Sequence, residues 1–309
     1  MLAKNSFALI FLSCFVAGLN AQILSYAMEC EFGDTEILGN SRYTCTLSDL
    51  DYDFSSPFYF IRLGGQHGAG RSNSDVQNLR IRDSIINRIP ANIFNVLPNV
   101  QSLEVINCGT LSIIPPDFFF AARLREIRMV ENQITRLTTA PFINAVSLET
   151  LILENNGITD LGPNPFAGLV NTRFISIANN EVQNITTQLM RPLRSLTTFD
   201  ASNNAIQEVD GRLFWHSPNI EIVNFSGNSI TAVGNSILNI NENLQQFWME
   251  GNGCANENYV ISNSVNLETI REGLVECFAN SPFGTQITLN VNGNLIIYDE
   301  NDQVLVRIE

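Results

Sequence analysis

Histidine is scarce in this chain of 309 residues, and the scarcity bears on catalysis. The two histidines are His67, in a glycine-rich loop, and His216, in a connecting segment. Neither stands where it could join a nucleophile to a base and an orienting group. No cluster of histidine and cysteine has the spacing of metal ligands. The sequence therefore predicts a protein that is not an enzyme and that holds no cofactor or metal.

Basic residues are also few, with 17 against 31 acidic ones. Removal of the signal peptide expected below takes away only Lys4, which leaves 16 basic against 31 acidic residues and a net charge of −15. Such a surface disfavours nucleic acid and anionic membranes as partners. The acidic residues form no long run, which is typical of a solvated, secreted surface.

Apolar runs long enough to span a membrane are missing. The first 21 residues contain Lys4, an apolar run from Phe7 to Gly18 and small residues up to Ala21, which is the layout of a secretory signal peptide. The run is shorter than the roughly 20 residues of a membrane span. The C-terminus lacks the apolar tail of a lipid-anchor signal. We expect a secreted, extracellular protein with no membrane span or lipid anchor.

A period of 24 residues fills the middle of the chain. The pattern restarts eight times, at Val76, Val100, Leu124, Leu148, Thr172, Leu196, Ile220 and Leu244. Apolar residues recur three and five positions into each unit, and a mostly asparagine column stands eight positions in. That column holds Ser84, Cys108, Asn132, Asn156, Asn180, Asn204, Asn228 and Asn252. The alternation predicts one short strand per unit, and the fixed period predicts a solenoid that offers a binding surface.

The frame L-x-x-L-x-L-x-x-N-x-I resembles the leucine-rich repeat superfamily, in its extracellular 24-residue type, over Val76 to Asn252. The resemblance implies an α/β solenoid, curved as a horseshoe, with a parallel β-sheet on the concave face and a disulfide-stapled cap at each end. The column asparagines would then satisfy backbone groups of neighbouring turns. The chain also looks like the small secreted leucine-rich repeat proteins of arthropods, whose relatives serve in immune recognition, cell adhesion and receptor binding.

The repeat frame divides the chain into segments. We expect a signal peptide at 1–21, an N-terminal cap at 22–75, eight repeats at 76–252, a C-terminal cap helix within 253–284 and a β-strand tail at 285–309. The cap helix is indicated by the helical spacing of Leu267, Ile270, Leu274 and Phe278. The tail holds three alternating runs separated by turn residues, which predicts a small β-meander.

Two pairs of cysteines flank the repeats, Cys30 with Cys45 before them and Cys254 with Cys277 after them. An open stack of repeats leaves an apolar cross-section at each end, which a disulfide-stapled cap would seal. Pairing across the solenoid would have to join its opposite ends, so local pairing is favoured, although the sequence leaves the connectivity open.

Two columns are expected to be structural. Cys108 lies in the asparagine column, where we expect a buried thiol whose weak S–H donor replaces the asparagine side chain, rather than an intermolecular disulfide. A further column stands eighteen positions into the repeats and should belong to the core rather than to a ligand site. It holds Phe94, Phe118, Phe142, Phe166, Met190, Phe214 and Leu238.

The strand residues that point away from the core carry whatever binding function exists. In the N-terminal half we expect Ile106, Val130, Ile152 and Phe174 to expose apolar groups with charged residues around them, which is the usual anatomy of a protein interface. The predicted partner-binding residues are Arg80, Arg82, Glu104, Ile106, Arg128, Val130, Ile152, Glu154 and Phe174. The alternative is that these aliphatic residues only favour strand formation.

Two glycosylation sequons begin at Asn184 and Asn224. Asn184 lies on a connecting segment, whereas Asn224 falls on the concave face. A glycan at Asn224 would obstruct the C-terminal half of the sheet and leave the N-terminal half open.

Two further motifs are weaker. Gly65 to Ser72 nearly matches a phosphate-binding loop, but Arg71 replaces the lysine and no helix is expected to follow. Asn290 to Tyr298 is similar to the mannose-binding box of bulb lectins, in a single copy with two polar positions changed.

The sequence thus predicts a secreted module that binds a protein ligand or receptor, in innate immune recognition or extracellular signalling. A structural, cell-adhesion or matrix protein and a carbohydrate binder are the alternatives. The sequence leaves homo-oligomerisation open.

Overall fold

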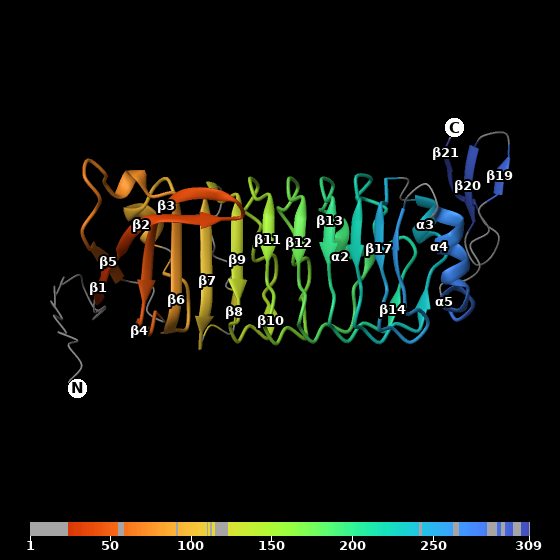
Figure 1. Cartoon of the computed structure of the whole chain (residues 1–309), viewed down its shortest axis with the longest axis horizontal. Coiled ribbons are helices and arrows are strands. Elements are labelled where there is room, and N and C mark those ends of the chain that lie inside the picture. Colours follow the sequence, from red (N-terminus) through yellow and green to blue (C-terminus); the bar gives the residue numbers. More distant parts are fainter. Residues whose placement is uncertain are drawn as a thin grey trace, which may run out of the picture.

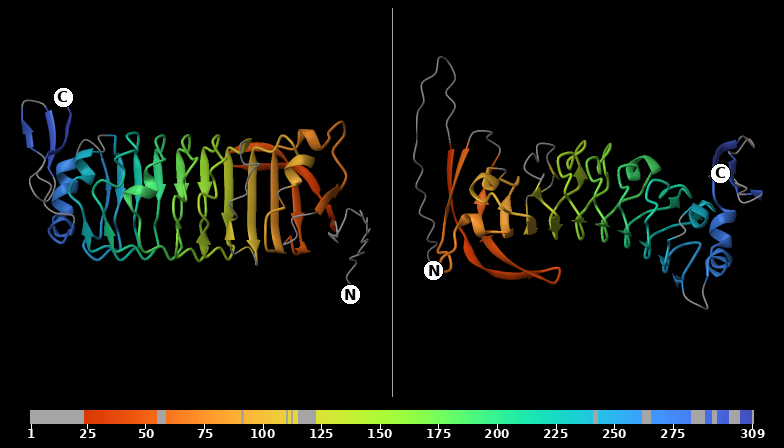
Figure 2. Two further views of the ribbon diagram at one scale, coloured as in Figure 1. Left: turned by 180° about the vertical axis from the view of Figure 1, so that it is seen from behind. Right: turned by 90° about the horizontal axis from the view of Figure 1, so that it is seen from above.

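A computed structural model describes residues 24–54, 59–90, 92–109, 111, 113–114, 123–240, 243–261, 266–282, 289–291, 294–298 and 304–308. The expected signal peptide lies outside the described residues. The chain forms a gently curved row of turns in which each repeat lies beside the next (Figures 1 and 2). The prediction of a leucine-rich repeat solenoid with stapled caps is confirmed.

One strand from each repeat builds the main sheet. All eight are parallel, and paired residues are 24 positions apart, as in Thr150 beside Glu126 and Phe174. These strands are β6 (Asn78–Ile86), β7 (Ser102–Cys108), β9 (Glu126–Val130), β11 (Thr150–Ile152), β12 (Phe174–Ser176), β13 (Thr198–Asp200), β15 (Ile222–Asn224) and β17 (Gln246–Trp248). The sequence period therefore equals the sheet register, because each repeat advances the chain by one strand.

The asparagine column closes each turn through its amide groups. Asn204 donates from Nδ2 to the carbonyls of Ile177 (3.0 Å) and Ala201 (3.1 Å), and its Oδ1 accepts from the backbone N–H of Val182 (3.0 Å). Asn132, Asn180 and Asn228 are buried at 8% exposure. The ladder thus satisfies backbone groups that the turn would otherwise leave unpaired.

Cys108 takes its place in this ladder, as predicted. Its thiol lies 3.9 Å from the carbonyl oxygen of Ile81 and 3.6 Å from that of Ile106, the backbone positions that correspond to the acceptors of Asn132. Burial raises the pKa of the thiol to about 11. Cys108 is therefore a buried, protonated member of the column.

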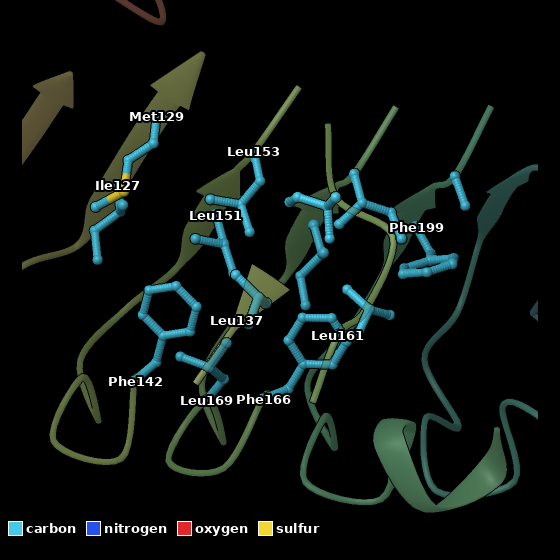
Figure 3. Packing of buried hydrophobic residues seen from close by; sticks show 14 of the residues in the cluster. Ile127, Met129, Leu137, Phe142, Leu151, Leu153, Leu161, Phe166, Leu169 and Phe199 are labelled. Atoms are coloured by element: carbon cyan, nitrogen blue, oxygen red, sulfur yellow. The ribbon is translucent and has the colours of Figure 1, made fainter. Parts of the chain in front are cut away.

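The apolar columns pack between the sheet and the opposite, convex side (Figure 3). Phe142 and Phe166 are fully buried beneath Leu151 and Leu153. Met190 and Phe214, in later repeats, are also buried. The column eighteen positions into the repeats therefore belongs to the core at Phe142, Phe166, Met190, Phe214 and Leu238. Phe94 is only partly buried, and Phe118 lies outside the described residues. Stacking of these side chains joins the repeats into one core.

Short elements line the rest of each turn. Two-residue strands pair in parallel, β8 with β10 and β14 with β16. They are β8 (Ile113–Ile114), β10 (Arg136–Leu137), β14 (Glu208–Val209) and β16 (Ala232–Val233). Single helical turns form α1 (Ile93–Val96), α2 (Thr187–Met190) and α3 (Ile237–Ile240).

The N-terminal cap extends the main sheet. Its strands are β1 (Leu24–Glu29), β2 (Glu31–Ile37), β3 (Asn40–Ser48), β4 (Asp51–Tyr52) and β5 (Tyr59–Gly64), followed by the 3-10 helix η1 (Asn73–Asp75). Strand β3 pairs in parallel with β6 and antiparallel with β2, while β1 and β5 form a separate pair. A disulfide joins Cys30 to Cys45, as the favoured local pairing predicts.

The C-terminal cap covers the other end. Strand β18 (Asn258–Val260) pairs antiparallel with β17, and Cys254 is joined to Cys277. Helical structure is divided into α4 (Leu267–Gly273) and α5 (Val275–Ala279), where a single helix was expected. The break falls at Leu274, directly after Gly273, where a side chain would collide with Tyr259.

The tail forms the expected antiparallel meander, in the order β19-β20-β21. Its strands are β19 (Leu289–Val291), β20 (Asn294–Tyr298) and β21 (Val304–Ile308). The turns between these strands lie outside the described residues.

Candidate functional site: the concave face

The concave face carries the strand residues two, four and six positions into each repeat. It is the side toward which the hairpin of β2 and β3 projects, as the right-hand view of Figure 2 shows. This cap hairpin crosses in front of β6 and β7 in Figure 1. The N-terminal cap therefore covers part of the surface that the repeats present.

The tip of the cap hairpin is a two-residue turn. Ile37 pairs with Asn40, and the residues between them, Leu38 and Gly39, have φ angles of 47° and 80°. Two positive φ angles define the turn type that matches the strand twist of a hairpin. Leu38 is 58% exposed, whereas Ile37 is buried at 5%. The tip thus turns one aliphatic side chain toward the sheet and the other toward solvent.

An ion pair holds the tip against the third repeat strand. Arg42 on β3 donates from Nη1 to Oε2 of Glu126 (2.8 Å) and from Nη2 to Oε1 (2.5 Å). The two side chains are only 14% and 15% exposed. A bidentate pair of this kind fixes both distance and orientation.

Polar side chains fill the space nearer the base of the cap hairpin. Thr44 contacts the hydroxyl of Thr35 (2.6 Å) and accepts from Nδ2 of Asn78 (3.3 Å), which also donates to Glu104 (3.2 Å). Glu104, at 3% exposure, accepts from Nε of Arg80 (2.8 Å). Oδ1 of Asn78 is buried without a hydrogen-bond partner. The contact between hairpin and sheet is therefore largely polar.

A pocket of about 350 Å³ lies between the tip and strands β7, β9 and β11. Carboxylates and guanidinium groups mix on its walls with aliphatic side chains. The lining residues are Glu36, Ile37, Leu38, Arg80, Ser102, Glu104, Glu126, Ile127, Arg128, Thr150, Ile152 and Glu154. Arg128 is 40% exposed and lies 3.7 Å from Glu104, which is already paired with Arg80.

Five of the nine predicted partner-binding residues meet at this pocket: Arg80, Glu104, Arg128, Ile152 and Glu154. The other four do not line it. Arg82 is exposed beside Asp83, Ile106 and Phe174 are half-buried, and Val130 is buried.

The expectation that Val130 and Ile152 are exposed is wrong. Val130 is 1% exposed and Ile152 is 8% exposed. Ala178 and Ser202 occupy the same column as Val130 and are also buried, although they lie beyond the cap hairpin. Neighbouring strands are only about 4.8 Å apart, so side chains at the same position of successive repeats cover one another on a concave sheet.

The sequence interpretation missed the contribution of the cap hairpin. Gly39 between two alternating runs is a turn signal that could have indicated the hairpin. No local pattern shows that the tip would reach Glu126, because residues 84 positions apart in the sequence make that contact.

The two sequons differ in their surroundings. Asn184 is exposed on its connecting segment. Asn224 is half-buried, donates from Nδ2 to Asp200 (3.1 Å) and accepts from the N–H of Ser226 (3.0 Å).

The glycine-rich loop packs against the strands of the N-terminal cap. His67 stacks on Phe32 at 3.7 Å and contacts the Tyr43 hydroxyl (3.0 Å), while Arg71 lies over the Tyr43 ring at 4.2 Å. Only the three-residue η1 follows the loop, which is too short to present a helix N-terminus to phosphate.

None of the helices in the described residues is long and apolar enough to cross a membrane. Two disulfides are typical of proteins from an oxidising, extracellular compartment.

Comparison with solved structures finds other solenoids of this kind. TLR13, in a complex with ssRNA13, is 19% identical, with 56% of this chain and 24% of that chain covered and a TM-score of 0.49. A leucine-rich repeat protein of Leptospira interrogans is 17% identical, with coverages of 58% and 50% and a TM-score of 0.45. The Drosophila Toll–Spatzle complex is 16% identical, with 58% and 29% covered and a TM-score of 0.44. The chain thus spans between a quarter and a half of the length of these structures.

A family model matches part of the repeats. No curated protein matches the sequence. The family model described as leucine rich repeat matches residues 122–182 and 146–206. These matches fall on the repeats whose strands, asparagine ladder and core columns are described above. Residues 122–206 are therefore identified as leucine-rich repeats, and solenoids of such repeats serve as interaction scaffolds.

Proposed function

We propose that this protein is a secreted module that binds a protein partner on its concave face, with the pocket at the hairpin tip as part of the site. The observation that carries the proposal is the convergence of Arg80, Glu104, Arg128, Ile152 and Glu154 around that pocket. Its volume falls at the lower end of the range for ligand sites, which suits one or two side chains of a partner.

A protein fits this surface better than a small molecule does. Eight strands side by side make a surface about 35 Å wide. Leu38 projects from the tip beside the pocket, so a partner could contact hairpin and sheet together. Solenoids of this kind use such extended concave surfaces for binding.

The biological setting belongs to the same proposal. The resemblance to small secreted arthropod proteins supports a role in innate immune recognition or extracellular signalling. The two stapled caps support an extracellular location.

The test is capture of a partner from the native extracellular fluid by photo-cross-linking. Amine-reactive reagents are unsuitable, because Lys4 is the only lysine and falls in the expected signal peptide. A photoreactive group introduced at Leu38 reaches the pocket mouth instead. Identification of the cross-linked protein by mass spectrometry then allows its affinity to be measured.

Two variants decide whether the pocket is used. Arg128→Ala should weaken the captured partner's binding by about tenfold. The matched control is Arg136→Ala, since Arg136 is exposed on β10, away from the pocket. Equal affinities of the two variants would contradict the proposal. Concentration-dependent self-association without a partner would favour a matrix role, and retention on glycan resin would favour carbohydrate binding.

A further inference from the structure

We infer that strands β13, β15, β17 and β18 form a second interaction surface, which takes a basic segment of a partner protein around an apolar anchor. This open half of the concave face lies beyond the cap hairpin, and no described segment crosses it in Figures 1 and 2. The inference rests on the proposed function only in assuming a protein partner, because its residues are separate from the pocket.

The apolar part of the open half lies at its C-terminal end. Trp248 is 37% exposed on β17, and Val260 is 51% exposed on β18. Gln246 pairs with Val260, and Trp248 pairs with Asn258, so both apolar side chains stand on the concave side of adjacent strands. Phe174 and Ile222 are half-buried on the same face. Tryptophan is among the residues most enriched as anchors in protein interfaces.

The charge of this region specifies the partner. Residues 196–282 contain 10 acidic and 2 basic residues, a net charge of −8, whereas residues 24–195 contain 17 acidic and 13 basic residues, a net charge of −4. Both basic residues pair with an acidic neighbour, Arg212 with Asp210 (2.9 Å) and Arg271 with Glu268 (3.4 Å).

The concave positions of the open half repeat this imbalance. Asp200 and Glu250 stand there, and no lysine or arginine does. Complementary charge therefore calls for arginine or lysine on the partner. A guanidinium group also stacks favourably on an indole ring such as that of Trp248.

Asn224 makes the inference sensitive to modification. It is the register partner of Trp248 on the neighbouring strand, and it donates to Asp200. A glycan on Asn224 would stand beside the anchor and exclude a partner. The inference therefore requires Asn224 to be unmodified, while exposed Asn184 is free to carry a glycan.

The experiment is selection of a random peptide display library on the full chain, made through a eukaryotic secretory pathway. Selected peptides should be enriched in arginine or lysine next to an apolar residue. Their affinity should fall about tenfold in Trp248→Ser and about fivefold in the double variant Asp200→Asn, Glu250→Gln. The double variant Glu208→Gln, Glu272→Gln removes the same charge from exposed residues off this face and should change affinity less than about twofold.

Failure of this inference is distinguishable from failure of the proposed function. Peptides that lose affinity in Arg128→Ala but not in Trp248→Ser would overturn the second surface and leave the pocket standing. Neutral or acidic selected peptides, or no enrichment at all, would also overturn it. Peptide mapping that finds Asn224 glycosylated in the secreted protein would overturn it independently of any peptide.

Discussion

The two halves of the concave face use one repeat frame and present different surfaces. The covered half, on β6, β7, β9 and β11, lies under the cap hairpin and carries arginine beside glutamate. The open half lies beyond the hairpin, is acidic and exposes Trp248. The core columns and the asparagine ladder continue through both halves. The frame therefore determines the fold, and the variable strand positions together with the caps determine what a partner meets.

The asparagine ladder gives the largest expected difference between the halves. Asn204→Ala, in the open half, removes three donated and one accepted hydrogen bond and should lower the free energy of unfolding by about 3 kcal/mol. Cys108→Ala, in the covered half, removes only weak thiol contacts and should cost about 1 kcal/mol. Urea unfolding of both variants measures the difference; equal losses would show that the thiol is not a weaker substitute.

The cap hairpin should be separable from the rest of the covered half. Arg42→Ala leaves the poorly exposed Glu126 carboxylate without its partner, at a cost of about 2 kcal/mol. Hydrogen exchange should become faster in β2 and in the outer part of β3, and stay unchanged in β12 to β17. The control Arg62→Ala removes an exposed arginine elsewhere in the cap. Equal effects of the two variants would contradict the conclusion that the Arg42–Glu126 ion pair holds the cap hairpin against the sheet.

High pH should act on the covered half through Cys108. Burial raises the folded pKa of this thiol to about 11, above the ordinary thiol pKa of 9.0. The unfolded state releases the thiol proton at lower pH than the folded state does. The contribution of the protonated Cys108 thiol to the free energy of unfolding is therefore complete below pH 9 and is lost as the pH rises toward 11. Cys108→Ala should show a flatter stability profile between pH 9 and 11. Identical profiles for the variant and the parent would contradict the assignment.

Trp248→Ala should have the smallest effect on stability. More than a third of the side chain is exposed, and we expect a loss of less than about 1 kcal/mol. Phe247→Ala, on the buried side of the same strand, should cost about 4 kcal/mol. Thermal unfolding of the pair tests whether Trp248 belongs to the surface; a similar loss in both would place it in the core.

Much of the fold follows from the sequence because each repeat repeats the same local chemistry. The strands and the role of Cys108 follow from the spacing of the repeats. The asparagine ladder is what the family resemblance implies, and the cap disulfides have the local pairing that the sequence favours but does not fix. The burial of Val130 and Ile152 does not follow from the sequence, since burial on a concave sheet depends on the neighbouring strands rather than on alternation within one strand.

The candidate site could be predicted only in part, for a related reason. Spacing identifies the residues on the concave face, such as Arg128 and Glu154, and five of the nine predicted partner-binding residues line the pocket. The wall made by Ile37 and Leu38 depends on where the cap hairpin folds. That contact joins segments far apart in the sequence, and nothing in either segment encodes it alone.

The difference between the halves is tested most directly by hydroxyl-radical footprinting of the free protein. The account predicts that Trp248, Val260 and Leu38 are oxidised readily, while Ile37 and Ile152 are protected relative to the unfolded chain. In Arg42→Ala, protection of Ile37 should fall and the oxidation of Trp248 should stay the same. Ile37 oxidised in the parent protein as fast as in the unfolded chain would contradict a cap hairpin that lies on the sheet.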